Sequence, residues 1–546
     1  MPKAEPTGPE RGGPGERGLR EVERLDRELL RLLARRADLL AGSVRPLKGG
    51  ERLEPGLEKR LRAAFEAAGR ELGLDLALVR KLFVLAGCVG RPKPAARPGA
   101  PGAFVLAPRS EPVQLDMQGP RSLACARLWV VLAAATGQAV SLSPLEPGDA
   151  VLDLVKAVNQ AGGRLSREAD ALRAAMGEPA DLDGATLFAG DQPGTLYALL
   201  ALGLRGAGRC RLTGGQYLRL LDLAPAGRLL PQLGARLASL DRHSPGLPAA
   251  LEFGGPAAER VELAPDVAPD LAACLAVMGF CLPGGLRLSF DPDGAHGPAL
   301  AEAAAVLGQC GIAAEIDRGD CRVPPGTPSL PAAPCLPLDP ELCAYLLALP
   351  ALAGGAVRLA GPWPESGAAR EIAAGLAAAG LALDIGATGI SSKAGTKKPK
   401  ARLEFGRRPA LFPLALALGL ALGEAEIALP GDAETAGFGR DMLDRLGVSC
   451  REQGGALILS PGRPSWSGTW TSPGPYFTLG LALAAFKAPG IAVDNPGSLA
   501  GLWPRFWTVY NALPSGRARP RPARREDSHA GARAGRRVLV RDDQGA

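Results

Sequence analysis

Arg36 is the side chain near the start of the chain whose position most clearly requires an ionic partner. It interrupts a stripe formed by Leu25, Leu29, Leu32 and Leu39, whose alternating spacings of four and three residues place them on one helix face. Because a buried guanidinium is costly unless it is paired, Arg36 is expected to bind an anion. The alternative is that its long side chain reaches solvent from the edge of the stripe.

A second helix is predicted around Glu54 and Glu58, which are four residues apart and therefore share a face. A third helix is expected after Asp75, a favourable N-cap residue. Residues 17–90 are helical in pattern throughout. Three helices of this length bury only a thin core, so this segment is expected to dimerise or to dock on another surface.

A run of lysines could also bind anions. Lysine is scarce in the rest of the chain, and four lysines lie between Lys393 and Lys400, in the stretch SSKAGTKKPKAR. This cluster could hold a phosphate or a carboxylate. Its glycine, proline and lysine content is equally typical of a solvated loop.

The elements that must position such residues belong to a repeated unit. Each unit has an apolar strand, a Gly/Pro loop, an Ala/Leu helix, a glycine that ends the helix, and two more short strands. The helix-ending glycines are Gly163, Gly234, Gly311, Gly380 and Gly447, at spacings of 71, 77, 69 and 67 residues. Near-constant spacing indicates one supersecondary unit copied five times and begun a sixth time, in an α/β fold.

Composition divides the 546 residues into five parts. Residues 1–16 and the basic tail at 516–546 are expected to be disordered. Residues 17–90 form the helical module, and the Pro-rich stretch 91–102 is a linker. The repeats fill residues 103–515.

Charge and hydropathy exclude several classes of protein. The net charge is +7, of which the tail supplies +5, so the body presents no broad surface for nucleic acid. No secretion signal and no membrane-spanning run is visible, and the ten cysteines form no CxxC pair. With three histidines, a His-based metal site is not expected. A cytoplasmic protein with free thiols is the simplest expectation.

The helical module resembles the all-helical chorismate mutases. The similarity runs through LREVERLDRELLRLLARRADLL, the stretch RPLK and LEPGLEKRL. It implies that Arg36 binds a substrate carboxylate, that Lys48 lies one place from the lysine that touches the ether oxygen, and that Glu58 contacts the substrate hydroxyl, with Glu54 on the same helix face. One arginine of the family falls on Leu19 here, and the third helix is interrupted after Gly87.

The repeat region resembles the 5-enolpyruvylshikimate-3-phosphate (EPSP) synthases over about 400 residues. The similarity is carried by VQLDMQGPRSLACARLWVVLAAATG, GDQPGTLYALLALGLRGAGRCRLTGG and IAVDNPGSLAGLWPRFWTVYNAL. It implies an inside-out α/β barrel of six repeats in two domains, with buried helices and outer sheets. One lobe would comprise residues 119–333, and the other residues 103–118 and 334–515. Shikimate 3-phosphate and phosphoenolpyruvate would bind between them, without a cofactor or metal.

The same resemblance identifies site residues and their losses. Arg121, Ser122, Arg127, Gly194 and Thr195 fall at substrate-binding positions, and Arg121 and Asp339 are the catalytic candidates. Most other basic and acid–base positions have changed; the replacements are at Ala198, Ala224-Pro225, Ala268-Pro269-Asp270, Ala410, Pro473-Gly474-Pro475 and Gly501. Removing one such group costs orders of magnitude in rate.

Both resemblances point to the shikimate pathway and to aromatic amino-acid biosynthesis, because one reaction leads to chorismate and the other consumes it. Two function classes follow. The chain is either a divergent EPSP synthase with a rearranged site, or an inactive scaffold or regulator. Weak chorismate mutase activity of the module is a further alternative, and a homodimer through that module is expected.

Overall fold

The computed structural model describes residues 14–41, 44–47, 50–53, 55–74, 79, 82–83, 85–86, 104–168, 170–241, 245–396, 400–405 and 408–514. The predicted linker and tail lie outside these residues. So do Lys48, Glu54 and part of the lysine cluster.

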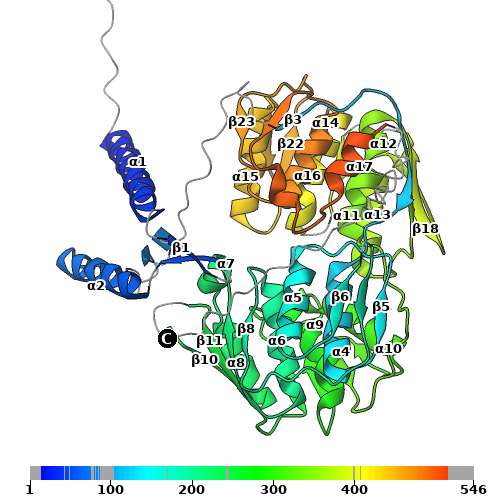
Figure 1. Ribbon diagram of the computed structural model, residues 1–546. Coiled ribbons are helices and arrows are strands. Elements are labelled where there is room, and N and C mark those ends of the chain that lie inside the picture. The colour runs from blue at the N-terminus through cyan, green and yellow to red at the C-terminus, as the bar shows by residue number, and fades with distance from the viewer. Residues whose placement is uncertain are drawn as a thin grey trace, which may run out of the picture.

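The body has two lobes joined by two crossings of the chain (Figure 1). The core of the first lobe is built from residues 125–336. The core of the second lobe combines residues 106–115 with residues 338–513. After the N-terminal module, the chain thus enters the second lobe, crosses to the first and returns. The crossings touch each other where Arg121 forms an isolated antiparallel bridge with Leu338.

Three sheets belong to the first lobe. Their strands, in spatial order, are β5 (Val140–Leu142), β7 (Leu172–Ala174) and β6 (Leu165–Arg167); β8 (Thr186–Phe188), β9 (Gly208–Thr213), β11 (Ala249–Phe253) and β10 (Ala235–Ser239); and β12 (Arg260–Glu262), β13 (Leu286–Ser289), β15 (Asp320–Val323) and β14 (Glu315–Asp317).

Three sheets belong to the second lobe. Their strands are β4 (Val113–Gln118), β16 (Gly355–Ala360), β18 (Gly389–Ala394) and β17 (Leu381–Gly386); β19 (Ala401–Leu403), β20 (Ala425–Ala428), β22 (Ala456–Leu459) and β21 (Cys450–Gln453); and β23 (Thr469–Trp470), β24 (Ile491–Val493) and β3 (Phe104–Leu106).

The four-stranded sheets share one plan. The first strand is parallel to the second, and the third and fourth are antiparallel to their neighbours; β8, β12, β4 and β19 are the first strands. The parallel first pair requires a crossover, which a helix supplies. Each sheet among the described residues is open at both edges. No closed barrel is therefore observed among the described residues, and the sheets stand side by side around the helices.

The helices at the centre of each lobe are apolar on nearly every side, as the sequence predicts for buried helices. In the first lobe they are α4 (Leu123–Thr136), α6 (Pro193–Leu202) and α9 (Pro269–Met278). In the second lobe they are α11 (Pro340–Leu347), α12 (Leu349–Ala353), α14 (Phe412–Leu422) and α16 (Pro475–Ala484). The outer helices are α5 (Asp149–Gln160), α7 (Gln216–Leu220), α8 (Ala224–Leu229), α10 (His296–Gln309), α13 (Gly367–Ala378), α15 (Ala433–Arg445) and α17 (Phe506–Ala512).

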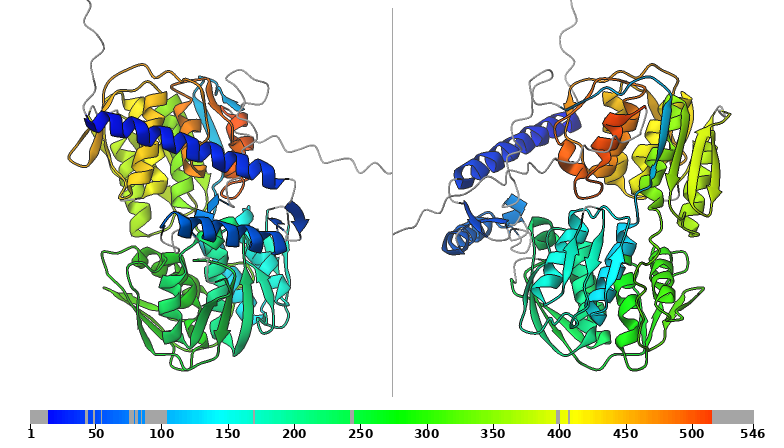
Figure 2. Two further views of the ribbon diagram at one scale, coloured as in Figure 1. Left: turned by 90° about the vertical axis from the view of Figure 1, so that its left-hand side faces the viewer. Right: turned by 45° about the vertical axis from the view of Figure 1, so that its right-hand side comes forward.

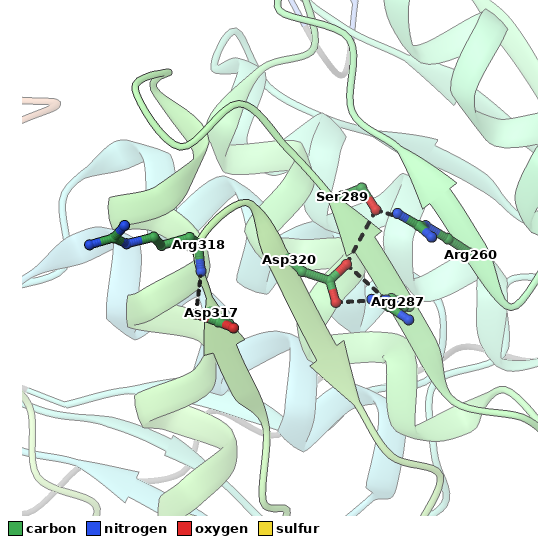
Figure 3. A network of polar contacts seen from close by, with 6 residues as sticks. All are labelled: Arg260, Arg287, Ser289, Asp317, Arg318 and Asp320. Carbon is green, nitrogen blue, oxygen red and sulfur yellow. Dashed lines mark hydrogen bonds and ion pairs between the residues drawn. The ribbon is translucent and has the colours of Figure 1, made fainter.

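Charged side chains cover the outer faces of the sheets. On the sheet that contains β13 and β15, Arg287 donates to both carboxylate oxygens of Asp320, at 2.9 and 2.6 Å, and Ser289 links Asp320 to Arg260 (Figure 3). The opposite faces carry the apolar residues of the core. This alternation is that of a sheet with one solvated face.

The glycines after the helices have the predicted role at four of five positions. Gly234, Gly311, Gly380 and Gly447 have positive φ angles between 63° and 85°, a conformation that favours glycine. After α5 the positive φ belongs to Gly162 rather than to Gly163, so that boundary was predicted one residue late.

The N-terminal module contains α1 (Pro14–Ala41) and α2 (Pro55–Glu71) (Figures 1 and 2). The prediction that residues 17–90 are all helical was wrong for the connection between these helices. An antiparallel hairpin forms there from β1 (Val44–Leu47) and β2 (Gly50–Leu53). Pro46 and Gly50 disfavour helix at this point, which explains the interruption. No described helix is long and apolar enough to cross a membrane.

Candidate functional site

The central helices of the first lobe bring their N-terminal ends together beside the crossing at Arg121. Ser122 caps α4 and accepts a hydrogen bond from the Cys125 N–H at 3.1 Å. Arg127, in the second turn of α4, lies against Gly194 at the start of α6; a Cβ atom at Gly194 would come within 2.5 Å of the guanidinium. Helix N-termini and arginines together favour anions.

An acidic side chain from a third helix already occupies this position. Arg127 donates to Asp270, in the first turn of α9, at 2.5 Å. The side chain of Arg127 is 15% exposed, whereas that of Asp270 is 45% exposed. The ion pair therefore covers the arginine and turns a carboxylate outward, so the charge offered to a ligand at this point is negative.

Ser122 has a second partner, which is a carboxylate. Its hydroxyl donates to Oε1 of Glu302 on α10 at 2.8 Å. Burial raises the pKa of Glu302, and the charge of Asp270 raises it further, whereas the bond from Ser122 and the charge of Arg127 lower it. The Ser122 hydroxyl, expected to hold a substrate phosphate, thus has its proton committed to the protein.

Thr195 lies beside these residues but is turned away from them. Its side chain is fully buried and donates to the carbonyl oxygen of Ala150 at 3.0 Å. This bond ties the start of α6 to the start of α5, which gives Thr195 a structural role in this conformation.

Arg121 is held by the two crossings themselves. It donates to the carbonyl oxygen of Leu336 at 3.2 Å and to Oε1 of Gln118 at 3.1 Å. Its guanidinium packs against Gly361, where an added Cβ atom would lie 1.9 Å from Nη1. Burial lowers the pKa of Arg121.

The second lobe contributes an acidic group to the same region. Asp339 caps α11 and accepts from the Leu342 N–H at 3.0 Å, while its own N–H donates to Pro120. Burial raises the pKa of Asp339 to about 7, helped by the charges of Glu341 and Glu302. Asp339 is therefore a group that can gain or lose a proton near neutral pH.

Glu341 connects the first turn of α11 to the beginnings of α14 and α16. Arg408 donates to its Oε1 at 3.4 Å, and the Tyr476 hydroxyl donates to its Oε2 at 3.3 Å. Arg408 also lies 3.7 Å from Glu371. Burial and the nearby carboxylates raise the pKa of Tyr476, so this phenol remains protonated.

We call Arg121, Ser122, Arg127, Asp270, Glu302, Asp339, Glu341, Arg408 and Tyr476 the junction cluster. Each of its arginines has an acidic or carbonyl partner within the chain. The cluster combines titratable carboxylates with hydroxyl groups, but it presents no unopposed cation to a dianion. No group of His, Cys, Asp or Glu that could hold a metal occurs among the described residues.

The lobes also touch at the start of α5. Arg505 forms an ion pair with Glu146, whose pKa is raised by burial. A Cβ atom at Gly148 would lie 2.2 Å from the carbonyl oxygen of Gly501. Glycine at position 148 therefore allows the backbones of the two lobes to approach closely.

Two neighbouring cavities, of about 650 and 390 Å³, lie elsewhere in the first lobe and share Phe253, Gly255 and Pro256. Glycine, proline and apolar residues make up most of their linings. Arg236 and Glu252, which line the larger cavity, are register partners of opposite charge on β10 and β11. The junction cluster is the stronger candidate site because it combines charged and titratable groups.

Among the described residues, Arg36 contacts a backbone carbonyl and an aromatic ring rather than a carboxylate. Its guanidinium donates to the carbonyl oxygen of Ala86 at 2.7 Å and lies 5.4 Å from the centre of the Phe83 ring. Burial lowers the pKa of Arg36. Only the backbone of Glu58 is described, within α2. Lys48, Glu54 and the side chain of Glu58 lie outside the described residues, so the mutase-like site stays a prediction.

Several solved structures superimpose on the two-lobed body of this chain. EPSP synthase from Acinetobacter baumannii superimposes with a TM-score of 0.62 at 14% sequence identity, covering 75% of this chain and 98% of that chain. A second structure of that enzyme gives 0.59 at 14% identity, with 76% and 98% covered. The enolpyruvyl transferase NikO from Streptomyces tendae gives 0.58 at 17% identity, with 74% and 96% covered.

The body of this chain has the fold of the EPSP synthases. The superposition spans almost all of those chains and about three quarters of this one. No family model matches the sequence, and no curated protein matches it either. At this identity the likeness establishes the EPSP synthase fold alone.

Sequence reasoning missed four members of the junction cluster. Glu302 lies in an alanine-rich helical run without a motif, and Glu341, Arg408 and Tyr476 did not stand out either. The negative charge of Asp270 was visible as a departure from the resemblance, but its pairing with Arg127 was not.

Proposed function

We propose that this chain is an EPSP synthase-like protein of the shikimate and chorismate pathway that has lost most of its catalytic residues and acts as a scaffold or regulator. The observation that carries the proposal is the ion pair between Arg127 and Asp270. It joins the beginnings of two central helices, where a phosphate would otherwise be favoured.

Electrostatics supports this conclusion. A unit charge 4 Å from a like charge is destabilised by about 4 kcal/mol near a protein surface, at an effective dielectric constant of about 20. A phosphate beside Arg127 would meet Asp270 and lie near Glu302, whose hydrogen bond also occupies Ser122. Each of the two phosphorylated substrates would therefore have to displace these internal partners, and the displacement would weaken its binding.

The test is phosphate release from shikimate 3-phosphate and phosphoenolpyruvate by the purified full chain. We expect no turnover above background, with an active EPSP synthase as the positive control in the same buffer. Turnover above about 1 per second, an ordinary enzymatic rate, would overturn the proposal.

A second candidate function is a divergent enolpyruvyl transferase. Asp339 favours it, because a carboxyl group with a pKa of about 7 is suited to acid–base catalysis. In that case Asp339→Asn would lose the phosphate release while remaining folded, and the wild-type rate would depend on pH around 7. Activity that is unchanged in Asp339→Asn would exclude this role for the carboxyl.

For the N-terminal module we propose a dimerisation or regulatory role, with weak chorismate mutase activity as the alternative. Arg36 supports the former, because it is bound to Ala86 and packed on Phe83. Disappearance of chorismate, followed by ultraviolet absorbance, tests the alternative. Turnover that is lost in Arg36→Ala would support a mutase.

A further inference from the structure

An ion pair joins helix α2 of the N-terminal module to the first lobe, beside which α2 lies in Figures 1 and 2. Arg62 donates to both carboxylate oxygens of Asp241, at 3.2 Å each, although the two residues are 179 positions apart. The side chain of Arg62 is 20% exposed and that of Asp241 is 15% exposed. Because a bidentate pair that is mostly buried has a defined geometry, it marks a docking contact rather than a solvated surface pair.

The inward face of α2 explains why Arg62 requires this partner. Arg62, Phe65 and Gly69 are spaced by three and four residues and share that face. Phe65 meets the ring of Phe83 edge-on at 5.6 Å. Gly69 packs so closely on Val79 that an added Cβ atom would lie 2.6 Å from its side chain. Arg62 thus places a charge on a packed face, which is costly unless an opposite charge meets it.

Phe83 connects this contact to helix α1. The centre of its ring lies 5.7 Å from the guanidinium of Arg62 and 5.4 Å from that of Arg36. Each guanidinium is attracted to the ring. Arg36 also donates to the carbonyl oxygen of Ala86. The described parts of the module therefore form one packed unit, which Arg62 fastens to the first lobe.

The surface that receives Arg62 lies at the end of β10. We call residues 239–241 and 245–248 the docking loop. The Ser239 hydroxyl donates to the carbonyl oxygen of Asp241 at 2.7 Å. The N–H of Leu247 donates to the carbonyl oxygen of Leu218, in α7, at 2.9 Å. An added Cβ atom at Gly246 would lie 2.0 Å from that same oxygen, so the docking loop packs directly on α7.

Helix α7 connects the docking loop to the start of α6. The N–H of Tyr217 donates to Oδ1 of Asp191 at 2.7 Å. Asp191 lies two residues before α6, whose Gly194 packs against Arg127 of the junction cluster. A continuous series of contacts therefore runs from the module through Asp241 and α7 to the junction cluster.

We propose that the N-terminal module docks on the first lobe of its own chain through Arg62 and Asp241, and that this docking restrains α7 and the start of α6. Residues 87–103, which connect the module to the body, can span about 55–60 Å when extended. A tether of this length gives an effective concentration in the millimolar range, on the order expected for short linkers. A contact too weak to hold two separate chains is therefore populated within one chain. The inference goes beyond the proposed function and does not depend on it.

The first experiment compares amide hydrogen exchange in the full chain with exchange in Arg62→Glu. The reversed charge would face Asp241 and undock the module, so α7 and residues 245–248 should exchange about tenfold faster. Residues 381–394 of the second lobe should exchange at the wild-type rate. Unchanged exchange in α7, or an equal rise in the second lobe, overturns the proposal.

Arg60→Glu is the matched control for this variant. Arg60 is an exposed residue of the same helix, so reversing its charge should leave the exchange of α7 unchanged. A rise in Arg60→Glu equal to that in Arg62→Glu would show that the effect follows from charge alone, and would overturn the proposal.

The second experiment exchanges the two charges. Asp241→Arg should also speed the exchange of α7, and the double variant Arg62→Glu/Asp241→Arg should restore slow exchange, because the pair can form with reversed polarity. Such a rescue would not occur if Arg62→Glu simply unfolded α2. Failure of the rescue overturns the role of this pair.

A concentration series identifies which module occupies the docking surface. Docking within one chain predicts that the protection of α7 does not depend on protein concentration. Protection that increases with concentration would mean that the module of a second copy docks instead, and would overturn the proposal. Phosphate release is not measured in these experiments, so their outcome is separate from that of the proposed function.

Discussion

Arg127 and Asp270 are 143 residues apart in the sequence and form a 2.5 Å ion pair between the second turn of α4 and the first turn of α9, two central helices. The pair fills the position at which an EPSP synthase-like protein would be expected to hold an anion. A single substitution that neutralises the internal carboxylate can therefore test whether the site still binds anions.

Asp270→Asn should increase the affinity of the protein for inorganic phosphate about tenfold. The neutral amide removes a repulsive charge and releases the guanidinium of Arg127. Isothermal titration calorimetry with phosphate measures the change. Asp266→Asn is the control, because Asp266 forms an exposed ion pair with Arg228 in the same lobe but outside the junction cluster. Equal affinities for Asp270→Asn and wild type would contradict the account of the site.

The difference between what could and could not be predicted is visible at Ser122. Its residue type and its place before an apolar run predict an N-cap, and it caps α4. Its second partner, Glu302, is 180 residues away and is brought near only by the packing of α10. Local signals also predicted the buried helices and most of their glycine ends. The pairing of charges between helices depends on tertiary packing, which residue spacing does not encode.

Ser122→Ala should destabilise the protein more than an ordinary cap replacement. Loss of a cap costs about 1 kcal/mol, and loss of the hydrogen bond to Glu302 adds roughly 1–3 kcal/mol if that buried acid is left unsatisfied. The urea midpoint of the helical signal measures the effect. The control is Ser366→Ala, which removes a similar 3.1 Å cap bond to Ala369 on the outer helix α13. Equal losses for the two variants would show that Glu302 gains nothing from Ser122.

Asp339 should make the protein less stable as the pH rises from about 4 to about 7. Its pKa is about 7 in the folded protein, against about 3.9 in an unfolded chain. Between these values the folded state retains a proton that the unfolded state has lost. Stability therefore falls by up to about 1.4 kcal/mol per pH unit and levels off above the folded pKa.

Asp339→Asn separates this contribution from those of the other carboxyl groups, because asparagine still caps a helix but does not titrate. We expect the variant and the wild type to have similar urea midpoints at low pH, and the variant to be more stable at pH values above 7. Parallel pH profiles for the two proteins would mean that Asp339 titrates normally.

Gly361→Ala should destabilise the second lobe by about 2 kcal/mol or more. Gly361 has a φ of 134°, which is unfavourable for alanine, and the new methyl group would overlap the Arg121 guanidinium. In an Arg121→Ala background the overlap disappears and only the backbone cost remains. The double variant should therefore be more stable than the sum of the single changes predicts, by about 0.5–3 kcal/mol.

Gly367→Ala, at an unobstructed position at the start of α13, is the control and should be neutral or slightly stabilising. Urea unfolding of the four variants measures the coupling, and strict additivity would show that Arg121 does not need the space that Gly361 leaves.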